Sequence, residues 1–139
     1  MRPGIDLTRT FPAPAQRVFD AWTQGDLLAQ WFGLPDAEVA ATCDARVGGG
    51  WELSMAGPHG ATRFSGAYTA VDAPTHLAYT MQVDGAGGTE TCTVDIAPQP
   101  DGCELRFTQD GGNLTAEQYE QATAGYAVFL ERLDALTRG

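Results

Sequence analysis

Lysine is absent from this 139-residue sequence. The eight basic residues are all arginines, dispersed from Arg2 to Arg138, and 18 acidic residues outweigh them to leave a formal net charge of −10. Nucleic acids and anionic membranes are bound by clustered positive charge, so the sequence predicts neither as a partner. Without lysine, side chains also cannot supply a Schiff base or an amine nucleophile.

Nucleophiles and metal ligands are scarce too. The two serines, Ser54 and Ser65, fall on polar strand positions and outside any G-x-S-x-G motif. The two histidines, His59 and His76, are not spaced as metal ligands. The glycine runs lack the helix and the lysine of a phosphate-binding loop. No catalytic constellation is visible, and we predict no catalytic residue, no metal site and no cofactor.

Export and membrane-insertion signals are missing as well. Residues 1–10 lack the apolar segment of a signal peptide, and no apolar run approaches the roughly 18 residues of a membrane span. The three cysteines, Cys43, Cys92 and Cys103, form no C-x-x-C pair and are too few for a disulfide framework. We therefore expect a single cytoplasmic domain over residues 1–139, with its thiols reduced.

What the sequence does contain is a long region of strand patterning. After a first strand over Ile5–Phe11, turn clusters rich in glycine, proline and aspartate divide residues 37–110 into segments with apolar residues at alternate positions. The apolar sets are Trp51, Leu53 and Met55; Phe64, Gly66 and Tyr68; Leu77, Tyr79, Met81 and Val83; Cys92, Val94 and Ile96; and Cys103, Leu105 and Phe107. Mostly polar residues lie between them, which predicts an antiparallel sheet of about seven strands with one buried face.

Two short helices are predicted between the first strand and this region. The first should begin with Pro14 as its first helical residue and end at Gly25, because proline loses no hydrogen bond at that position. Its apolar stripe consists of Val18, Phe19 and Trp22. The second, capped by Asp26, carries Leu27, Leu28, Trp31 and Phe32.

The C-terminal segment predicts one long helix of roughly 22 residues. Thr115 and Gln118 form a capping box, and Leu114 and Tyr119 occupy the positions of a hydrophobic staple. The apolar stripe comprises Tyr119, Ala122, Tyr126, Phe129, Leu130, Leu133 and Leu136, and the opposite face carries Glu117, Glu120, Gln121, Glu131 and Asp134. The whole is an α+β architecture, with the long helix on the apolar face of the sheet and a ligand cavity expected in the gap between them.

Several blocks resemble, in order, the START-like (SRPBCC) proteins related to the activator of the heat-shock chaperone ATPase. They cover residues 9–14 (RTFPAP), 18–23 (VFDAWT), 31–32 (WF), 44–51 (DARVGGGW), 64–71 (FSGAYTAV) and 77–80 (LAYT). The resemblance implies a helix-grip fold, a curved sheet around the C-terminal helix, and a link to the stress response. The chain departs from the family at Gly125-Tyr126, where a Gly-Trp pair is usual.

An aromatic and methionine set marks the expected ligand site. Buried tyrosines and tryptophans need partners for their O–H and N–H groups, and a partly hydrated cavity would provide them. The candidate ligand-binding residues are Trp31, Trp51, Met55, Phe64, Tyr68, Tyr79, Met81, Phe107, Tyr119 and Tyr126. Glu52, Arg63 and Gln109 are polar candidates at strand ends, although alternation places the first two outward.

Three functions remain open on these grounds. The leading hypothesis is binding, carriage or sequestration of a hydrophobic, aromatic or polyketide-like small molecule, driven by burial of apolar surface. The resemblance also implies a polyketide cyclase or aromatase, which would need a positioned acid and base. It implies in addition a chaperone ATPase regulator, whose partner would be the chaperone, and self-association is a further option; both favour an exposed apolar patch.

Overall fold

The computed structural model describes residues 4–32, 38–57, 60–83, 88–111 and 115–138. Seven strands and three helices follow in the order β1 (Ile5–Phe11), α1 (Ala15–Thr23), α2 (Gly25–Trp31), β2 (Glu38–Cys43), β3 (Gly50–Gly57), β4 (Gly60–Asp72), β5 (His76–Val83), β6 (Glu90–Gln99), β7 (Gly102–Asp110) and α3 (Ala116–Arg138). This confirms the predicted α+β class with a long C-terminal helix.

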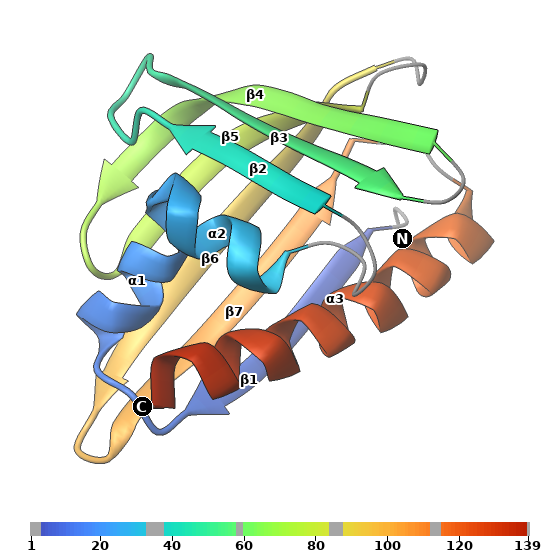
Figure 1. Cartoon of the computed structure of the whole chain (residues 1–139). Helices are drawn as coiled ribbons and strands as arrows, with labels where there is room; N and C mark the ends of the chain where they lie inside the picture. The colour runs from blue at the N-terminus through green and yellow to red at the C-terminus, as the bar shows by residue number, and fades with distance from the viewer. Residues whose placement is uncertain (1–3, 33–37, 58–59, 84–87, 112–114, 139) are drawn as a thin grey trace.

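The strands form one antiparallel sheet in the order β1-β7-β6-β5-β4-β3-β2. Strands β2 to β6 each pair with the next strand in the chain, and β1 completes the sheet against β7. The sheet curves strongly, and the three helices lie on one side of it (Figure 1). Helix α2 contacts the edge strand β2, while α3 contacts the opposite edge strand β1. This is the helix-grip arrangement.

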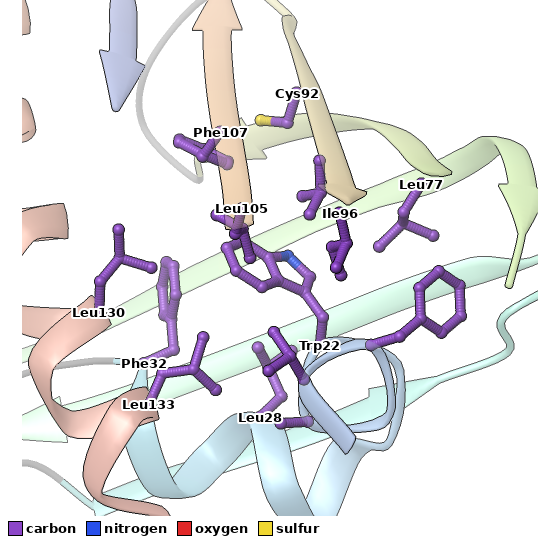
Figure 2. Close-up of a cluster of buried hydrophobic side chains, with 14 of the residues drawn as sticks. Trp22, Leu28, Phe32, Leu77, Cys92, Ile96, Leu105, Phe107, Leu130 and Leu133 are labelled. Carbon is purple, nitrogen blue, oxygen red and sulfur yellow. The ribbon is translucent and has the colours of Figure 1, made fainter. Parts of the chain in front are cut away.

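The core forms where the helices meet the inward face of the sheet. The predicted alternation is confirmed: the inward residues of β5, β6 and β7 are buried apart from the half-buried Val83 at the end of β5, and outward neighbours are mostly exposed. Figure 2 shows side chains from α1 and α2 meeting strand residues and the C-terminal half of α3. The labelled residues are Trp22, Leu28, Phe32, Leu77, Cys92, Ile96, Leu105, Phe107, Leu130 and Leu133.

The boundary between the two short helices differs from the prediction. Pro14 is the N-cap of α1, with φ −60° and ψ 144°, so the helix begins one residue later. Gln24 ends α1 and caps α2: its N–H donates to Asp20, and its carbonyl accepts from Leu28. Asp26 therefore lies in the first turn of α2 and is not the cap.

Gly25 does not end a helix; it begins α2 against the edge of the sheet. A Cβ built on Gly25 would lie 2.3 Å from the carbonyl oxygen of Ala41 on β2. This separation is far below a van der Waals contact, so only glycine allows α2 to approach β2 this closely. The glycine thus positions α2 over the sheet.

Helix α3 is anchored at both ends. At its start, the Thr115 N–H donates to Gln118 Oε1 at 2.8 Å and the Gln118 N–H donates to Thr115 Oγ1 at 3.1 Å, which confirms the capping box. The staple residue Leu114 lies outside the described residues. Near its end, Arg17 Nη1 donates to the Thr137 carbonyl at 3.1 Å. No helix in the described ranges is long and apolar enough to cross a membrane.

The predicted solvent face of α3 is wrong at Asp134. This residue is only 5% exposed, and its Oδ2 lies 3.1 Å from Arg9 Nη2 on β1. A buried carboxylate needs a compensating partner, and that partner comes from the other end of the chain. Helical periodicity carries no information about such a distant residue.

Candidate functional site

A small, largely apolar cavity lies between the two short helices and strands β3, β4 and β5. Its described walls consist of Trp22, Leu28, Phe32, Trp51, Leu53, Tyr68, Tyr79 and Met81. Its volume is about 20 Å³, counted as room for the centre of a water-sized sphere. Such a space holds about one water molecule. No described residue of α3 lines it, so the cavity lies under α1 and α2 and not along the long helix.

Four of the ten predicted ligand residues line this cavity, namely Trp51, Tyr68, Tyr79 and Met81. Two others, Met55 and Phe64, are half-buried on the neighbouring strands β3 and β4. Trp31 is fully buried, and its Nε1 donates to the Ala21 carbonyl at 2.8 Å, which fixes α2 on α1.

The remaining three predicted residues gather beneath α3. The rings of Phe107 and Tyr126 lie 4.5 Å apart between centroids, and Tyr119 is buried about two turns earlier on the same helix. Sequence reasoning missed Trp22, Leu28, Phe32 and Leu53 as lining residues, although all four were on predicted apolar faces. Their place in the cavity wall could not be predicted, because the sequence pattern does not indicate that the short helices cover β3 to β5.

The hydrogen-bonding side chains on the described walls are two indoles and two phenols. Trp51 Nε1 donates to the Thr80 carbonyl at 2.9 Å, and Trp22 Nε1 donates to the Tyr79 hydroxyl at 3.1 Å. Burial raises the pKa of Tyr79 well above its usual range, and burial followed by the Cys43 contact raises the pKa of Tyr68. Both phenols therefore stay protonated near neutral pH and remain hydrogen-bond donors.

Each of the two cavity tyrosines interacts with a cysteine thiol. Tyr68 interacts with the thiol of Cys43 and Tyr79 with that of Cys92, while the Cys92 thiol itself donates to Gln109 Oε1 at 3.7 Å. Burial is the larger influence on both thiols and raises their pKa, while the tyrosine contacts lower it. All three cysteines of the chain are free thiols.

The position of Trp51 depends on a glycine in the neighbouring strand. Gly66 is the register partner of Trp51, and a Cβ on it would lie 1.8 Å from the Thr80 oxygen and 2.7 Å from Trp51 Nε1. The absence of a side chain at this position lets the indole N–H reach the backbone of β5. Trp51 is thereby held in the wall while its ring packs edge-on against Tyr79, with centroids 5.5 Å apart.

Phe32 closes the cavity on the side of α3. Its ring lies 5.7 Å from that of Phe64, 5.8 Å from that of Tyr126 and 5.1 Å from that of Phe129, measured between centroids. Phe64 and Phe129 are half-buried and so reach the surface. Phe32 therefore stands between solvent and the cavity, at the end of a helix of only seven residues.

A second buried site, the α3 polar cluster, consists of Glu90, Gln109, Tyr119 and Tyr126. Tyr119 donates to Glu90 Oε1 at 2.6 Å, and Gln109 Nε2 donates to the same oxygen at 3.3 Å. Tyr126 donates to Gln109 Oε1 at 3.3 Å. Glu90 is 6% exposed and Gln109 3%.

The inward position of Gln109 agrees with its strand parity, whereas Glu90 was missed. Glu90 shares the parity of Cys92 and Val94 on β6, so alternation places it on the inward face. The apolar set predicted for this strand, however, begins at Cys92. Glu52 and Arg63 pair with each other on the outer face, as alternation predicted.

Gly125 does not serve a close approach of α3 to the sheet. A Cβ built on it would meet nothing within 4 Å, so a side chain could be added at this position without a clash. The hydroxyl of Tyr126 likewise has a protein partner in Gln109. Tyr126 therefore belongs to the packed core beneath α3.

Other chemistry is sparse in the described parts of the chain. No group of three or more His, Cys, Asp or Glu residues there is arranged to hold a metal ion. His76 Nδ1 lies 2.6 Å from Asp95 Oδ1 on the exposed face of the sheet, and His59 lies outside the described residues.

Comparisons with known proteins agree with this fold. The family described as activator of Hsp90 ATPase homolog 1-like protein matches residues 12–138. A crystal structure from Chromobacterium violaceum superposes with a TM-score of 0.90 at 27% identity, covering 100% of this chain and 99% of that one. A solution structure from Staphylococcus epidermidis has a TM-score of 0.86 at 26% identity, with 99% and 91% covered.

A third structure resembles the chain in fold alone. It is DynU16, a protein of the dynemicin biosynthetic locus, with a TM-score of 0.81 at 18% identity; the match covers 97% of this chain and 47% of that one. No curated protein matches the sequence significantly.

Proposed function

Because the chain belongs to the family of proteins like activator of Hsp90 ATPase homolog 1, we propose that it binds a hydrophobic, ring-containing small molecule under α1 and α2. The protein would carry or sequester this guest in the cavity, in the cytoplasm, where its three free thiols would stay reduced.

The composition of the cavity wall carries the proposal. Aromatic rings and aliphatic side chains form most of the described wall, and its hydrogen-bonding side chains are phenols and indoles. Burying the apolar surface of a guest contributes roughly 25 cal/mol per Å². The described wall has no carboxylate or imidazole to act as acid or base, which favours binding over catalysis.

The size of the cavity implies that a guest enters by displacing part of the wall. Sites for drug-sized ligands measure about 300–1,000 Å³, whereas this cavity offers room for about one water. Leu28 and Phe32 form the wall contributed by α2 and its end. An isolated helix of seven residues has little stability of its own, so we expect the cavity to be enlarged by a shift of α2.

Two measurements test the proposal. Native mass spectrometry of protein purified from its own host should detect a retained small molecule. Titration with fluorene, a neutral aromatic hydrocarbon, should quench tryptophan fluorescence saturably, because Trp22 and Trp51 line the cavity. A matched variant, Leu53→Trp, fills the cavity and should weaken fluorene binding at least tenfold. The absence of both a retained molecule and saturable quenching would contradict the proposal.

A second candidate is an enzyme of the cyclase type, favoured by the Glu90–Tyr119 hydrogen bond of 2.6 Å. A buried carboxyl group beside a phenol is a reasonable acid–base pair. Neither residue lines the cavity, which is why binding ranks first. The enzyme would lose turnover in Glu90→Gln while retaining ligand affinity.

Chaperone regulation has less support. The large apolar side chains exposed in the described parts of the chain are Val47 and Val128, which lie in a loop and on α3. Two scattered valines do not make the contiguous patch that a docking surface requires.

A further inference from the structure

The described residues of the cavity wall differ in what stands behind them. Five of the residues belong to β3, β4 and β5, whose strands pair with one another and with β6. They are Trp51, Leu53, Tyr68, Tyr79 and Met81. Paired strands lie only about 4.8 Å apart, which is too close for a ring compound to pass between them. This side of the cavity is therefore closed by the backbone of the sheet.

The wall contributed by the short helices consists of Trp22, Leu28 and Phe32. Trp22 is tied to the sheet by its hydrogen bond to the Tyr79 hydroxyl at 3.1 Å, and Leu28 lies in the middle of α2. Phe32 follows the last residue of α2 as its C-cap, and its N–H donates to the Leu28 carbonyl at 3.1 Å. Because the helix ends here, the Phe32 ring is the part of this wall that can turn with the least disturbance of the fold.

The Phe32 ring lies where α2, β4 and α3 meet. Its centroid is 5.7 Å from that of Phe64 on β4 and 5.1 Å from that of Phe129 on α3. Phe64 and Phe129 are half-buried, whereas Phe32 is only 8% exposed and also lines the cavity. The contacts between these three rings are individually weak. A guest that enters between Phe64 and Phe129 therefore displaces side chains and breaks no strand pairing.

We propose that Phe32 is the gate of the cavity: its ring turns aside to admit a guest between Phe64 and Phe129 and then closes behind it. This inference rests on the proposed function and adds how access to the site is controlled. The shift of α2 enlarges the space around the guest, whereas the Phe32 ring controls passage. A gate slows entry and exit to the same extent, because it lies on the path in both directions. A residue that only contacts the guest changes mainly the rate of exit.

Stopped-flow tryptophan quenching with fluorene tests the gate by measuring the association and dissociation rates. Phe32→Leu and Phe129→Leu each remove ring contacts at the gate. We expect both substitutions to raise the two rates together, by about fivefold to tenfold, while Kd stays within about threefold of the wild type. Phe129 is not among the described lining residues, so a change in the rates of its variant reports the gate and not a lost contact with the guest.

Met81→Leu is the matched control for these variants. Met81 also lines the cavity, but it lies on β5 with the sheet behind it. The substitution nearly conserves the volume of the side chain, so both rates should stay within about twofold of the wild type. Near-ultraviolet circular dichroism verifies that each variant is folded.

The outcomes separate the two proposals. If fluorene binds saturably but Phe32→Leu and Phe129→Leu leave both rates unchanged, the gate is overturned while ligand binding stands. The gate is also overturned if dissociation alone accelerates, because Phe32 would then be an ordinary contact of the guest. If fluorene does not bind saturably to the wild type, both proposals fail. A parallel rise of the two rates that is absent from Met81→Leu supports the gate.

Discussion

The protein contains two pairs of buried tyrosines that use their hydroxyls in different ways. Under α1 and α2, the Tyr79 hydroxyl accepts from Trp22 Nε1 at 3.1 Å, and Tyr68 interacts with the thiol of Cys43. Beneath α3, Tyr119 and Tyr126 donate to the carboxyl of Glu90 and the amide of Gln109. Oxygen acceptors form shorter and stronger hydrogen bonds than sulfur. The α3 polar cluster is thus suited to hold the long helix in place, whereas the Tyr79 hydroxyl in the cavity wall meets an indole N–H.

The rings around each pair support the same distinction. Tyr126 lies among the rings of Phe32, Phe107 and Phe129, with centroids 4.5–5.8 Å away, and it is not among the described lining residues of the cavity under α1 and α2. Tyr79 and Tyr68 adjoin the cavity. Space beside a side chain lets it change partners, whereas close packing does not.

The largest expected effect comes from removing the centre of the α3 polar cluster. Glu90→Ala takes away the oxygen that accepts from Tyr119 and Gln109 and leaves a void. We expect the free energy of unfolding to fall by about 3 kcal/mol, combining unsatisfied buried donors and a cavity. Urea unfolding measures it. Glu52→Ala, on the outer face, is the control and should change stability by less than about 0.5 kcal/mol. Equal effects of the two would mean that Glu90 does not hold α3.

Two glycine-to-alanine substitutions, each of which adds one methyl group, compare the cavity wall with helix α3. Gly66→Ala places a Cβ against the Thr80 oxygen and the Trp51 indole, so it should destabilise by roughly 1–3 kcal/mol and shift tryptophan fluorescence. Gly125→Ala meets nothing within 4 Å and should stabilise α3 by up to about 1 kcal/mol. Thermal unfolding of the two variants in parallel shows whether each substitution raises or lowers the stability of the protein. A destabilised Gly125→Ala would show that α3 packs more closely there than the structure has it.

The two glycines also show what could not be predicted from the sequence. Both lie in regular elements, and local pattern gives no reason to treat them differently; only the strand partner of Gly66 and the open surroundings of Gly125 separate their roles. The strand faces, the seven-stranded sheet and the capping box were predictable, because periodicity and capping depend on residues close in the chain.

The location of the cavity was not predictable on the same basis. It depends on how the sheet curves and on α2 lying against β2, which involves Gly25 and Ala41 in different elements. The burial of Asp134 likewise depends on Arg9, at the other end of the chain. Contacts between residues that lie so far apart in the chain produce no periodic pattern in a single sequence.

A smaller effect is expected at the start of α3, next to the polar cluster. Thr115→Ala removes the Oγ1 that accepts from the Gln118 N–H and should lower stability by about 1 kcal/mol, the usual effect of losing an N-cap. Gln121→Ala, exposed on the same helix, is the reference and should be nearly neutral. The denaturation midpoint reports both. If Thr115→Ala is also neutral, the first turn of α3 does not contribute to holding Tyr119 in the cluster.

The smallest effect isolates the hydroxyl groups themselves. Tyr126→Phe removes a donor to Gln109 Oε1 and should lower the free energy of unfolding by about 1 kcal/mol, the usual net value of a buried hydrogen bond. Tyr68→Phe removes a hydroxyl that interacts with the Cys43 thiol and should change stability by a few tenths of a kcal/mol, because sulfur is a weak acceptor. Each substitution deletes one oxygen atom and leaves the ring, so packing is matched between them. Urea unfolding of the two variants side by side, with the same denaturant slope, gives the difference directly. A Tyr68→Phe variant that loses as much stability as Tyr126→Phe would mean that its hydroxyl is firmly bound, and the contrast between an exchangeable wall and a fixed cluster would fail at that residue.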